Sequence, residues 1–82
     1  MKILVEVKTP GNGKTYEFQL DRAMSVGQAK TMMIEEITEI ESGNITLIPE
    51  KVILNNLNTE MKLEDTDSVS TTIKSGHNLI LL

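Results

Sequence analysis

The sequence ends on an apolar run, Leu79–Leu82, that follows a turn-forming stretch at Ser75–Asn78. The length of this run and its leucine and isoleucine content are typical of a buried β-strand. A strand at a chain terminus normally frays unless neighbouring strands hold it on both sides. We therefore predict that Leu79–Leu82 is the central strand of a small sheet, inserted between strands that come earlier in the sequence.

Composition limits the kinds of protein that can contain such a sheet. The chain has 82 residues, which fits one domain over 1–82. It has no cysteine, which excludes disulfides and thiolate metal ligands. No apolar run approaches the ~20 residues that cross a bilayer, and the first residues lack the basic-then-apolar order of a signal peptide. We expect a cytoplasmic protein with no direct membrane insertion. Its net charge of −4, with scattered lysines, argues against nucleic acid as a partner.

The first 20 residues have the pattern of a β-hairpin. Apolar and polar residues alternate over 2–8 and again over 14–20, and the stretch between them is rich in glycine and other turn formers. A glycine-rich loop can bind phosphate when a helix N-terminus follows it directly. Here a strand follows, so we interpret residues 9–13 as a turn.

The next segment has the pattern of one amphipathic helix. Ser25 and Gln28 have the Ser-x-x-Gln spacing of a capping box. Apolar residues then recur at three- and four-residue steps as far as Ile37, which gives the helix a single apolar face. Gly43 suits a left-handed residue at the helix end. This helix would cover one face of the hairpin, so we predict a two-layer α+β domain.

The second half of the chain predicts two short strands, 45–48 and 52–54, around a turn at 49–51. The polar segment 55–72 is long for a loop, so we expect short helical turns within it. Together with the terminal strand, these elements predict a mixed sheet of four to five strands packed on one α-helix.

The order of these elements and several local sequences resemble ubiquitin and its β-grasp fold. Residues 1–5 resemble ubiquitin's opening strand. Residues 20–33 align without a gap with its passage from strand to helix, and Ser25 takes the place of the helix-capping threonine. Residues 63–65 and 73–81 resemble ubiquitin's Leu-Glu-Asp and its closing strand. The resemblance implies a ubiquitin-like β-grasp fold.

The same resemblance implies one structural ion pair. In ubiquitin, the lysine and the aspartate that correspond to Lys30 and Asp65 form a partly buried pair. We therefore expect Lys30 and Asp65 to pair here and to tie the irregular segment to the helix. The alternative is two unrelated surface charges, which would contribute little to stability.

A narrower resemblance lies in the closing motif Ile-x-x-Gly-x-x-Leu-x-Leu-Leu, which begins at Ile73. It is similar to the end of the YukD/EsaB proteins, bacterial ubiquitin-like proteins of type VII (ESX/Ess-like) secretion loci, although His77 stands where members often have aspartate. The resemblance implies a cytosolic accessory or regulatory protein that contacts secretion-machinery components. The sequence ends at Leu82 without the Gly-Gly pair through which ubiquitin and sulfur carriers react, so we expect no conjugation.

The sequence contains few groups suited to catalysis. His77 is its one histidine, and we expect it to be solvated in the turn before the last strand. The glutamates between 35 and 41 lack the histidine or cysteine partners typical of a zinc site. We therefore expect no enzymatic activity, no metal and no cofactor.

Alternation along the predicted strands instead indicates a protein-contact face. The side chains expected to point inward are Ile3, Val5, Val7, Leu47, Leu79 and Leu81. Those expected on the outer face are Leu4, Thr46, Ile48, Ile80 and Leu82. Several apolar residues on one open face are typical of a contact surface, and the corresponding face of ubiquitin binds many partners.

Three alternatives to a contact face for a different protein remain open at this point. Loops or extra strands of the longer hairpin after residue 43 would cover these side chains. Two copies of the chain would pair through this face or through an edge strand as a homodimer. In the third alternative, the chain is an accessory subunit of another multiprotein complex, such as a monooxygenase. This alternative is open because a fold does not determine a function.

Overall fold

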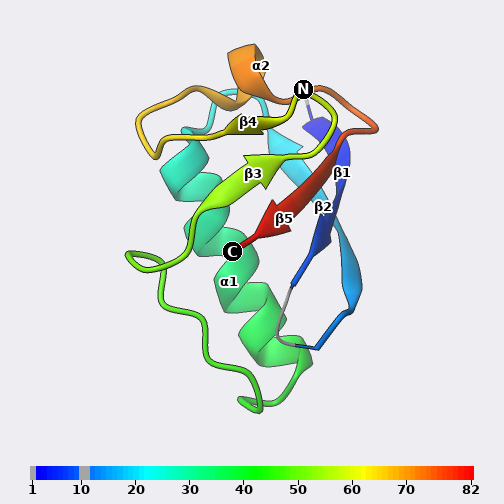
Figure 1. The fold of residues 1–82 in the computed structure, drawn as a ribbon, viewed down its shortest axis with the longest axis vertical. Coiled ribbons are helices and arrows are strands. Elements are labelled where there is room, and N and C mark those ends of the chain that lie inside the picture. Colours follow the sequence, from blue (N-terminus) through cyan, green and yellow to red (C-terminus); the bar gives the residue numbers. More distant parts are fainter. Residues whose placement is uncertain (1, 10–11) are drawn as a thin grey trace.

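The computed structural model describes residues 2–9 and 12–82. Within them, a five-stranded sheet in the order β2-β1-β5-β3-β4 packs on the long helix α1 (Figure 1). The strands are β1 (Lys2–Lys8), β2 (Thr15–Asp21), β3 (Leu54–Asn56), β4 (Met61–Lys62) and β5 (Asn78–Leu81). The helices are α1 (Val26–Ile40) and α2 (Val69–Thr72). The predicted α+β class, with a mixed sheet on one main helix, is confirmed.

Strand β5 lies in the centre of the sheet, as the apolar run at the end of the sequence predicts. It runs parallel to β1, where Leu79 lies opposite Val7. It runs antiparallel to β3, where Leu81 lies opposite Leu54. All four side chains are buried. Pairing on both sides supplies the hydrogen bonds that keep a terminal strand from fraying.

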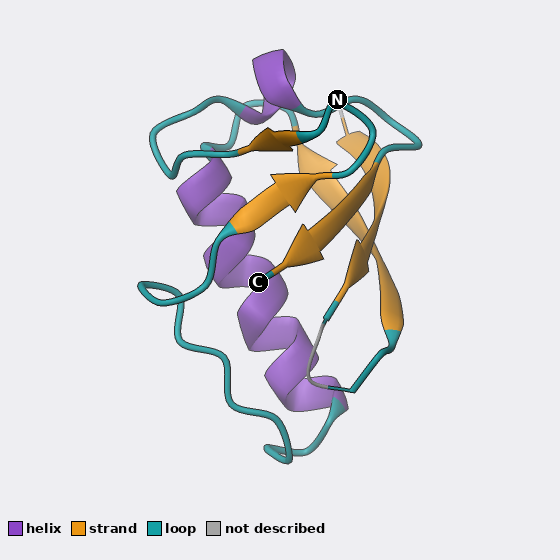
Figure 2. Cartoon of the chain, in the orientation of Figure 1, coloured by secondary structure: helices purple, strands orange, loops and turns teal. Residues whose placement is uncertain are grey.

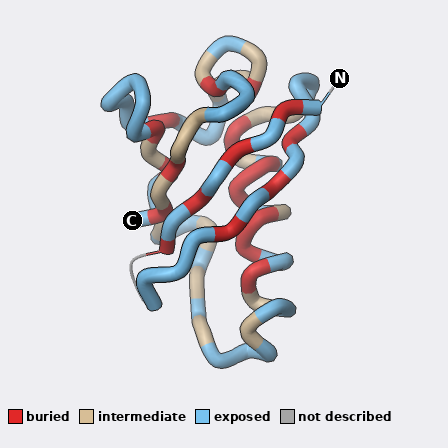
Figure 3. Tube along the Cα trace, turned by 90° about the vertical axis from the view of Figure 1, so that its right-hand side faces the viewer, coloured by how far each residue is buried: buried red, intermediate tan, exposed pale blue. Residues whose placement is uncertain are grey.

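The predicted hairpin forms from β1 and β2, which pair antiparallel from Lys2 opposite Asp21 to Lys8 opposite Thr15. Buried and exposed residues alternate along both strands (Figure 3). The side chains on the buried face are Ile3, Val5, Val7, Tyr16, Phe18 and Leu20. One face of the hairpin therefore contributes to the core, and the other faces away from α1.

Helix α1 begins at the predicted capping box. The Ser25 hydroxyl accepts a hydrogen bond from the backbone N–H of Gln28, and the Gln28 side chain accepts one from the backbone N–H of Ser25. The helix then crosses behind the sheet (Figure 2). Its buried residues are Val26, Ala29, Lys30, Met33, Ile34 and Ile37. All but Lys30 are apolar, so Lys30 is the one buried residue of this face whose charged group needs polar partners.

The end of α1 has two left-handed residues, where the sequence predicted one. Ser42 has φ 54° and Gly43 has φ 78°. The Ser42 N–H donates to the carbonyl of Glu39, and the Gly43 N–H donates to the carbonyl of Thr38. This is the hydrogen-bond pattern of a Schellman motif. Gly43 is left-handed as predicted, but Ser42 takes the first left-handed position.

The predicted strand at 45–48 is wrong, because residues 44–53 form a loop that leads from α1 to β3. Apolar residues of this loop, Ile45, Leu47 and Val52, pack partly buried against the core without pairing with a strand. The place beside β5 belongs to β3, which contains Asn55 and Asn56. Asparagine is depleted in strands, which hides this strand in the sequence. The predicted 55–72 segment contains the expected helical turn, α2, but also the unpredicted strand β4.

Candidate functional site

The open face of the sheet, which points away from α1, carries a pair of exposed apolar side chains next to its centre. Ile53 and Leu82 exchange two backbone hydrogen bonds of 2.9 Å each, so they lie directly opposite one another. Their neighbours Leu54 and Leu81 point into the core. Because side chains alternate along a strand, Ile53 and Leu82 point outward. Ile53 is 39% exposed and Leu82 is 57% exposed.

Ile80 extends this apolar surface along β5. It lies two residues before Leu82, on the same face of the strand, and opposite Asn55 on β3. Diagonal neighbours on adjacent antiparallel strands are ~7–8 Å apart, within reach of long side chains, so Ile80 also neighbours Ile53. We call Ile53, Ile80 and Leu82 the outer apolar patch. Leu57, 44% exposed, follows β3 and donates its N–H to the carbonyl of Asn78.

Lysines flank the outer apolar patch on both sides. Lys8 lies opposite Ile80 on β1, and Lys62 lies opposite Asn55 on β4. Both lysines are exposed. An apolar centre with a polar, solvent-accessible rim is the usual organisation of a protein–protein interface. The positive charge of this rim favours a partner with carboxylates around its apolar contact.

Among the predicted contact residues, Leu4, Ile80 and Leu82 belong to the outer face of the sheet, but Leu4 is separated from the other two. Glu6 lies opposite Asn78 and Lys8 lies opposite Ile80. Leu4 is therefore four residues along β1 from the level of Ile80, which corresponds to ~13 Å. Leu4, 45% exposed, is an isolated leucine outside the patch.

Thr46 and Ile48 do not lie on the sheet, so their predicted place on an outward strand face is wrong. Both belong to the loop 44–53, in which Ile48 is 42% exposed. The strand neighbour of Leu82 is Ile53, which sequence reasoning placed in a returning strand but did not assign to the contact face. Continuing the alternation of 52–54 through Asn55 would have placed Ile53 on the outer face.

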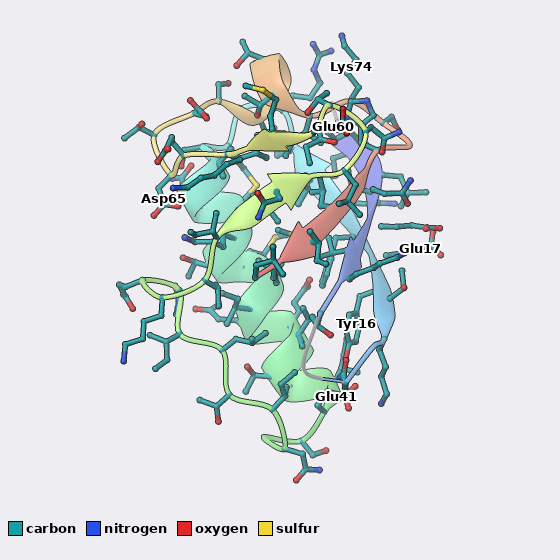
Figure 4. All side chains as sticks on the ribbon, in the orientation of Figure 1. Tyr16, Glu17, Glu41, Glu60, Asp65 and Lys74 are labelled. Atoms are coloured by element: carbon teal, nitrogen blue, oxygen red, sulfur yellow. The ribbon has the colours of Figure 1, made fainter. Side chains whose placement is uncertain are left out.

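The structure brings Lys30 and Asp65 together. The distance between Lys30 Nζ and Asp65 Oδ1 is 2.8 Å, and the same ammonium donates to the carbonyl of Val52 at 3.0 Å. The Lys30 side chain is 6% exposed and that of Asp65 is 60% exposed. Figure 4 shows Asp65 beside the first half of α1. The buried ammonium therefore connects the helix to two other segments, the loop before β3 and the segment after β4.

Gly27 lies where the start of α1 packs closely against the segment that carries Asp65. The Gly27 N–H donates to the Asp65 carbonyl at 3.0 Å, and the Val26 N–H donates to the Asp67 carbonyl at 2.8 Å. These bonds satisfy N–H groups that the first turn of a helix leaves unpaired. A Cβ atom on Gly27 would lie 3.2 Å from both the Cβ and the carbonyl oxygen of Asp65. The packing here therefore favours glycine despite its cost in helix propensity.

His77 is half-buried and hydrogen-bonded, so the prediction that it is solvated is wrong. Its Nδ1 accepts from the backbone N–H of Lys74 at 3.2 Å and lies 3.0 Å from the Nδ2 of Asn56. Asn56 is buried, and its Oδ1 accepts the backbone N–H of Asn58. Because an N–H group and an amide NH2 only donate, Nδ1 is the unprotonated nitrogen of the neutral ring. His77 thus joins the turn before β5 to the end of β3.

A second polar cluster joins β2 to the end of α1. Lys14 Nζ lies 2.9 Å from Glu41 Oε1, and the Tyr16 hydroxyl donates to Glu41 Oε2 at 2.9 Å. Tyr16 and Glu41 are adjacent in Figure 4. The hydrogen bond from Lys14, followed by that from Tyr16, lowers the pKa of Glu41. The hydrogen bond and charge of Glu41 in turn raise the pKa of Lys14.

Neither a metal-binding group nor a membrane-spanning helix occurs in the described part of the chain. Over residues 2–9 and 12–82, no three histidine, cysteine, aspartate or glutamate side chains gather as they would around a metal ion. Over the same residues, no helix has the length and apolar character needed to cross a bilayer.

Comparison with known proteins identifies the fold. No family model and no curated protein matches the sequence. The ubiquitin of Caldiarchaeum subterraneum is similar in structure, with a TM-score of 0.70 and 18% identity over 99% of this chain and 91% of that one. The N-terminal ubiquitin-like domain in the 4931431F19Rik protein has a TM-score of 0.68 and 23% identity, covering 99% of this chain and 73% of that one. A ubiquitin-like domain of an Arabidopsis thaliana protein has a TM-score of 0.68 and 20% identity, covering 99% and 76%. The fold is therefore the ubiquitin-like β-grasp.

Proposed function

We propose that this ubiquitin-like chain is a non-catalytic interaction module that binds another protein through its outer apolar patch. The observation that carries the proposal is the exposed pair Ile53 and Leu82, with Ile80 beside it, on the open face of the sheet. Fully burying a side chain of this kind contributes about 1.5–3 kcal/mol relative to leaving it exposed. A partner that covers the three side chains would gain a substantial part of its binding energy there.

The rim of the patch supports a particular partner chemistry. Lys8 and Lys62 lie on opposite sides of Ile80 and Asn55. A partner segment with an apolar anchor and flanking carboxylates would complement this arrangement. A second copy of the chain would bring the same lysines face to face, which disfavours a symmetric dimer through this face. We therefore expect sedimentation at micromolar concentration to give a monomer, and a stable dimer would favour self-association instead.

We further propose that the partner is a cytoplasmic component of a bacterial type VII secretion system. The support is the closing motif that begins at Ile73. Ile73, Leu79 and Leu81 are buried, and Gly76 has φ 90°, which favours glycine. Leu82 is an exposed leucine at the end of the motif and belongs to the outer apolar patch. The motif thus combines residues that the fold needs with one residue available to a partner.

Site-specific photocrosslinking in the source cells tests this proposal. A photoreactive benzophenone amino acid replaces Ile80 in one variant and Thr31, an exposed residue of α1, in a matched control. We expect adducts with secretion-machinery proteins from position 80 and none from position 31. Adducts with proteins of an unrelated complex would refute the secretion role. A lack of adducts at position 80, or equal labelling from both positions, would refute the contact face itself.

A further inference from the structure

A cleft of about 300 Å³ lies at the end of the sheet where β1 begins. Three segments that are far apart in the sequence each contribute one cation to its lining: Lys2 from β1, Arg22 from the link between β2 and α1, and Lys74 from the turn before β5. Among the residues that the structure describes, no acidic one lines it. The cleft is therefore a local concentration of positive charge.

This concentration is unusual for the chain, which has 12 acidic and 8 basic residues. Three of the eight basic residues line this one cleft. The acidic residues of α1 lie in its second half, toward the opposite end of the molecule, and Figure 4 shows Lys74 and Glu41 at opposite ends of the long axis. Asp21 lies opposite Lys2, and Glu60 lies at the same end of the molecule as Lys74 (Figure 4), but neither lines the cleft. Clefts lined by one sign of charge attract ligands of the opposite sign.

Two serines add hydrogen-bonding groups to the cleft. The Ser75 hydroxyl accepts the backbone N–H of Leu4 at 3.1 Å, which fixes its oxygen and leaves its proton to donate elsewhere. Ser70 also lines the cleft, and its hydroxyl lies 2.9 Å from that of Ser68. The remaining lining residues, Ile3 and Ile73, are buried. Cations and a hydroxyl donor over an apolar base suit carboxylate ligands, because low-dielectric surroundings strengthen electrostatic attraction.

We propose that this cleft is a second contact site, which binds an acidic peptide segment of a partner protein. Its volume favours a peptide over a single inorganic anion, since one water molecule already occupies ~30 Å³ in the liquid and a small anion would leave most of the cleft unfilled. The cations surround a compact hollow rather than forming the extended stripe that suits nucleic acid. The site does not depend on the outer apolar patch, from which Leu4, Glu6 and Asn78 separate it along the sheet.

Fluorescence anisotropy with a fluorescein-labelled peptide of alternating glutamate and aspartate tests this proposal. The test variant, Lys2→Gln with Lys74→Gln, removes two cleft charges and leaves Arg22 in place. The matched control, Lys14→Gln with Lys51→Gln, removes two exposed charges that belong to neither proposed contact site, so both variants lose two of the eight basic residues. We expect saturable binding that weakens about tenfold in the test variant and less than about twofold in the control. Equal weakening in both would overturn the proposal, because it would reflect general charge attraction.

Further arms of the experiment distinguish the site and the ligand. Lys2→Arg with Lys74→Arg keeps both charges and should retain binding, while Ile80→Glu should leave peptide binding unchanged because it alters only the outer apolar patch. Amide chemical-shift changes should gather at the Lys2 and Lys74 ends of the cleft, and changes centred on Lys8 would overturn the assignment. Displacement of the peptide by millimolar inorganic phosphate, or tighter binding to phosphatidylserine vesicles than to the peptide, would overturn the choice of an acidic peptide. Circular dichroism establishes that each variant is folded.

Discussion

The Lys30–Asp65 pair gives the sharpest prediction about stability, because its two side chains differ so much in exposure. Lys30 is 6% exposed and Asp65 is 60% exposed. Removing the carboxylate leaves a buried ammonium with the Val52 carbonyl as its remaining strong partner. Removing the lysine leaves a carboxylate that water can solvate. The two single substitutions should therefore lower the free energy of unfolding by different amounts. Once either residue has been replaced, replacing the other should change the free energy of unfolding only a little.

The magnitudes follow from these exposures. A hydrogen bond to a charged group contributes about 1.5–3 kcal/mol, and solvent screening at an exposed aspartate brings Asp65→Asn to the lower end, about 1–2 kcal/mol. Lys30→Met keeps the buried aliphatic stem and removes the charge, so it should cost about 1 kcal/mol, chiefly from the unpaired Val52 carbonyl. With methionine at position 30, Asp65→Asn should then cost less than about 0.5 kcal/mol. The expected coupling energy is about 1 kcal/mol.

A double-mutant cycle by urea unfolding measures this coupling. Circular dichroism is the suitable signal, because the chain has no tryptophan and one tyrosine. For a domain of this size, a change of 1 kcal/mol corresponds to a shift of about 4–8 °C in Tm. Losses that add within about 0.3 kcal/mol would refute the reasoning, since additivity is the behaviour of residues that do not interact.

Three other structural features give predictions of their own. The hydrogen bond from Lys14 lowers the pKa of Glu41, so this carboxylate stabilises the fold above the usual glutamate pKa and the stabilisation is lost as the pH falls through the lowered value. Glu41→Gln should therefore flatten the acid side of a plot of Tm against pH, and an unchanged slope would contradict this role. Gly27→Ala should destabilise the protein by about 1–3 kcal/mol in urea unfolding, because the new Cβ would press on Asp65 at 3.2 Å. If Gly27→Ala instead stabilised the protein through its better helix propensity, the segment around Asp65 would have to move away from the new Cβ at little cost. Nitrogen-15 NMR at neutral pH should find His77 as the tautomer with its proton on Nε2, and a proton on Nδ1 would contradict the hydrogen bonds assigned to that atom.

The parts of the fold that could be predicted from the sequence are those fixed by local patterns. The capping box at Ser25 and Gln28 depends on residues three apart, and the hairpin depends on alternation on either side of a turn. The apolar run at 79–82 predicted the strand β5, which lies in the centre of the sheet. In each case, the residues that specify the element also lie within it.

The second half of the chain was harder to predict, because its apolar residues do not mark its strands. Ile45 and Leu47 pack against the core from a loop, whereas β3 contains Asn55 and Asn56. The amide of Asn56 is used in buried hydrogen bonds to the Thr72 carbonyl and to neighbouring backbone N–H groups. Such a network depends on contacts between distant segments, and a local propensity for strands does not contain that information.

The same difference between local patterns and long-range contacts decided which residues of the candidate site could be predicted. Ile80 and Leu82 were placed on the outer face correctly, because side-chain direction alternates within one strand. The outward direction of Ile53 follows from alternation through Asn55, but its position beside Leu82 does not, because the register between β5 and β3 depends on two segments that are more than 20 residues apart in the sequence. The structural role of His77 was missed for the same reason, since its partner Asn56 lies on β3.

The central claim, that the outer apolar patch binds a partner protein, is tested most directly by combining Ile80→Glu with a photoreactive residue at Leu82 in the source cells. Ile80 is only partly buried on the open face, so the substitution should change the free energy of unfolding by less than about 1 kcal/mol. We predict that the photoreactive residue at position 82 crosslinks one partner when Ile80 is present. Ile80→Glu should abolish this adduct while the protein stays folded. Undiminished crosslinking in the Ile80→Glu variant, or unfolding of that variant, would contradict the claim.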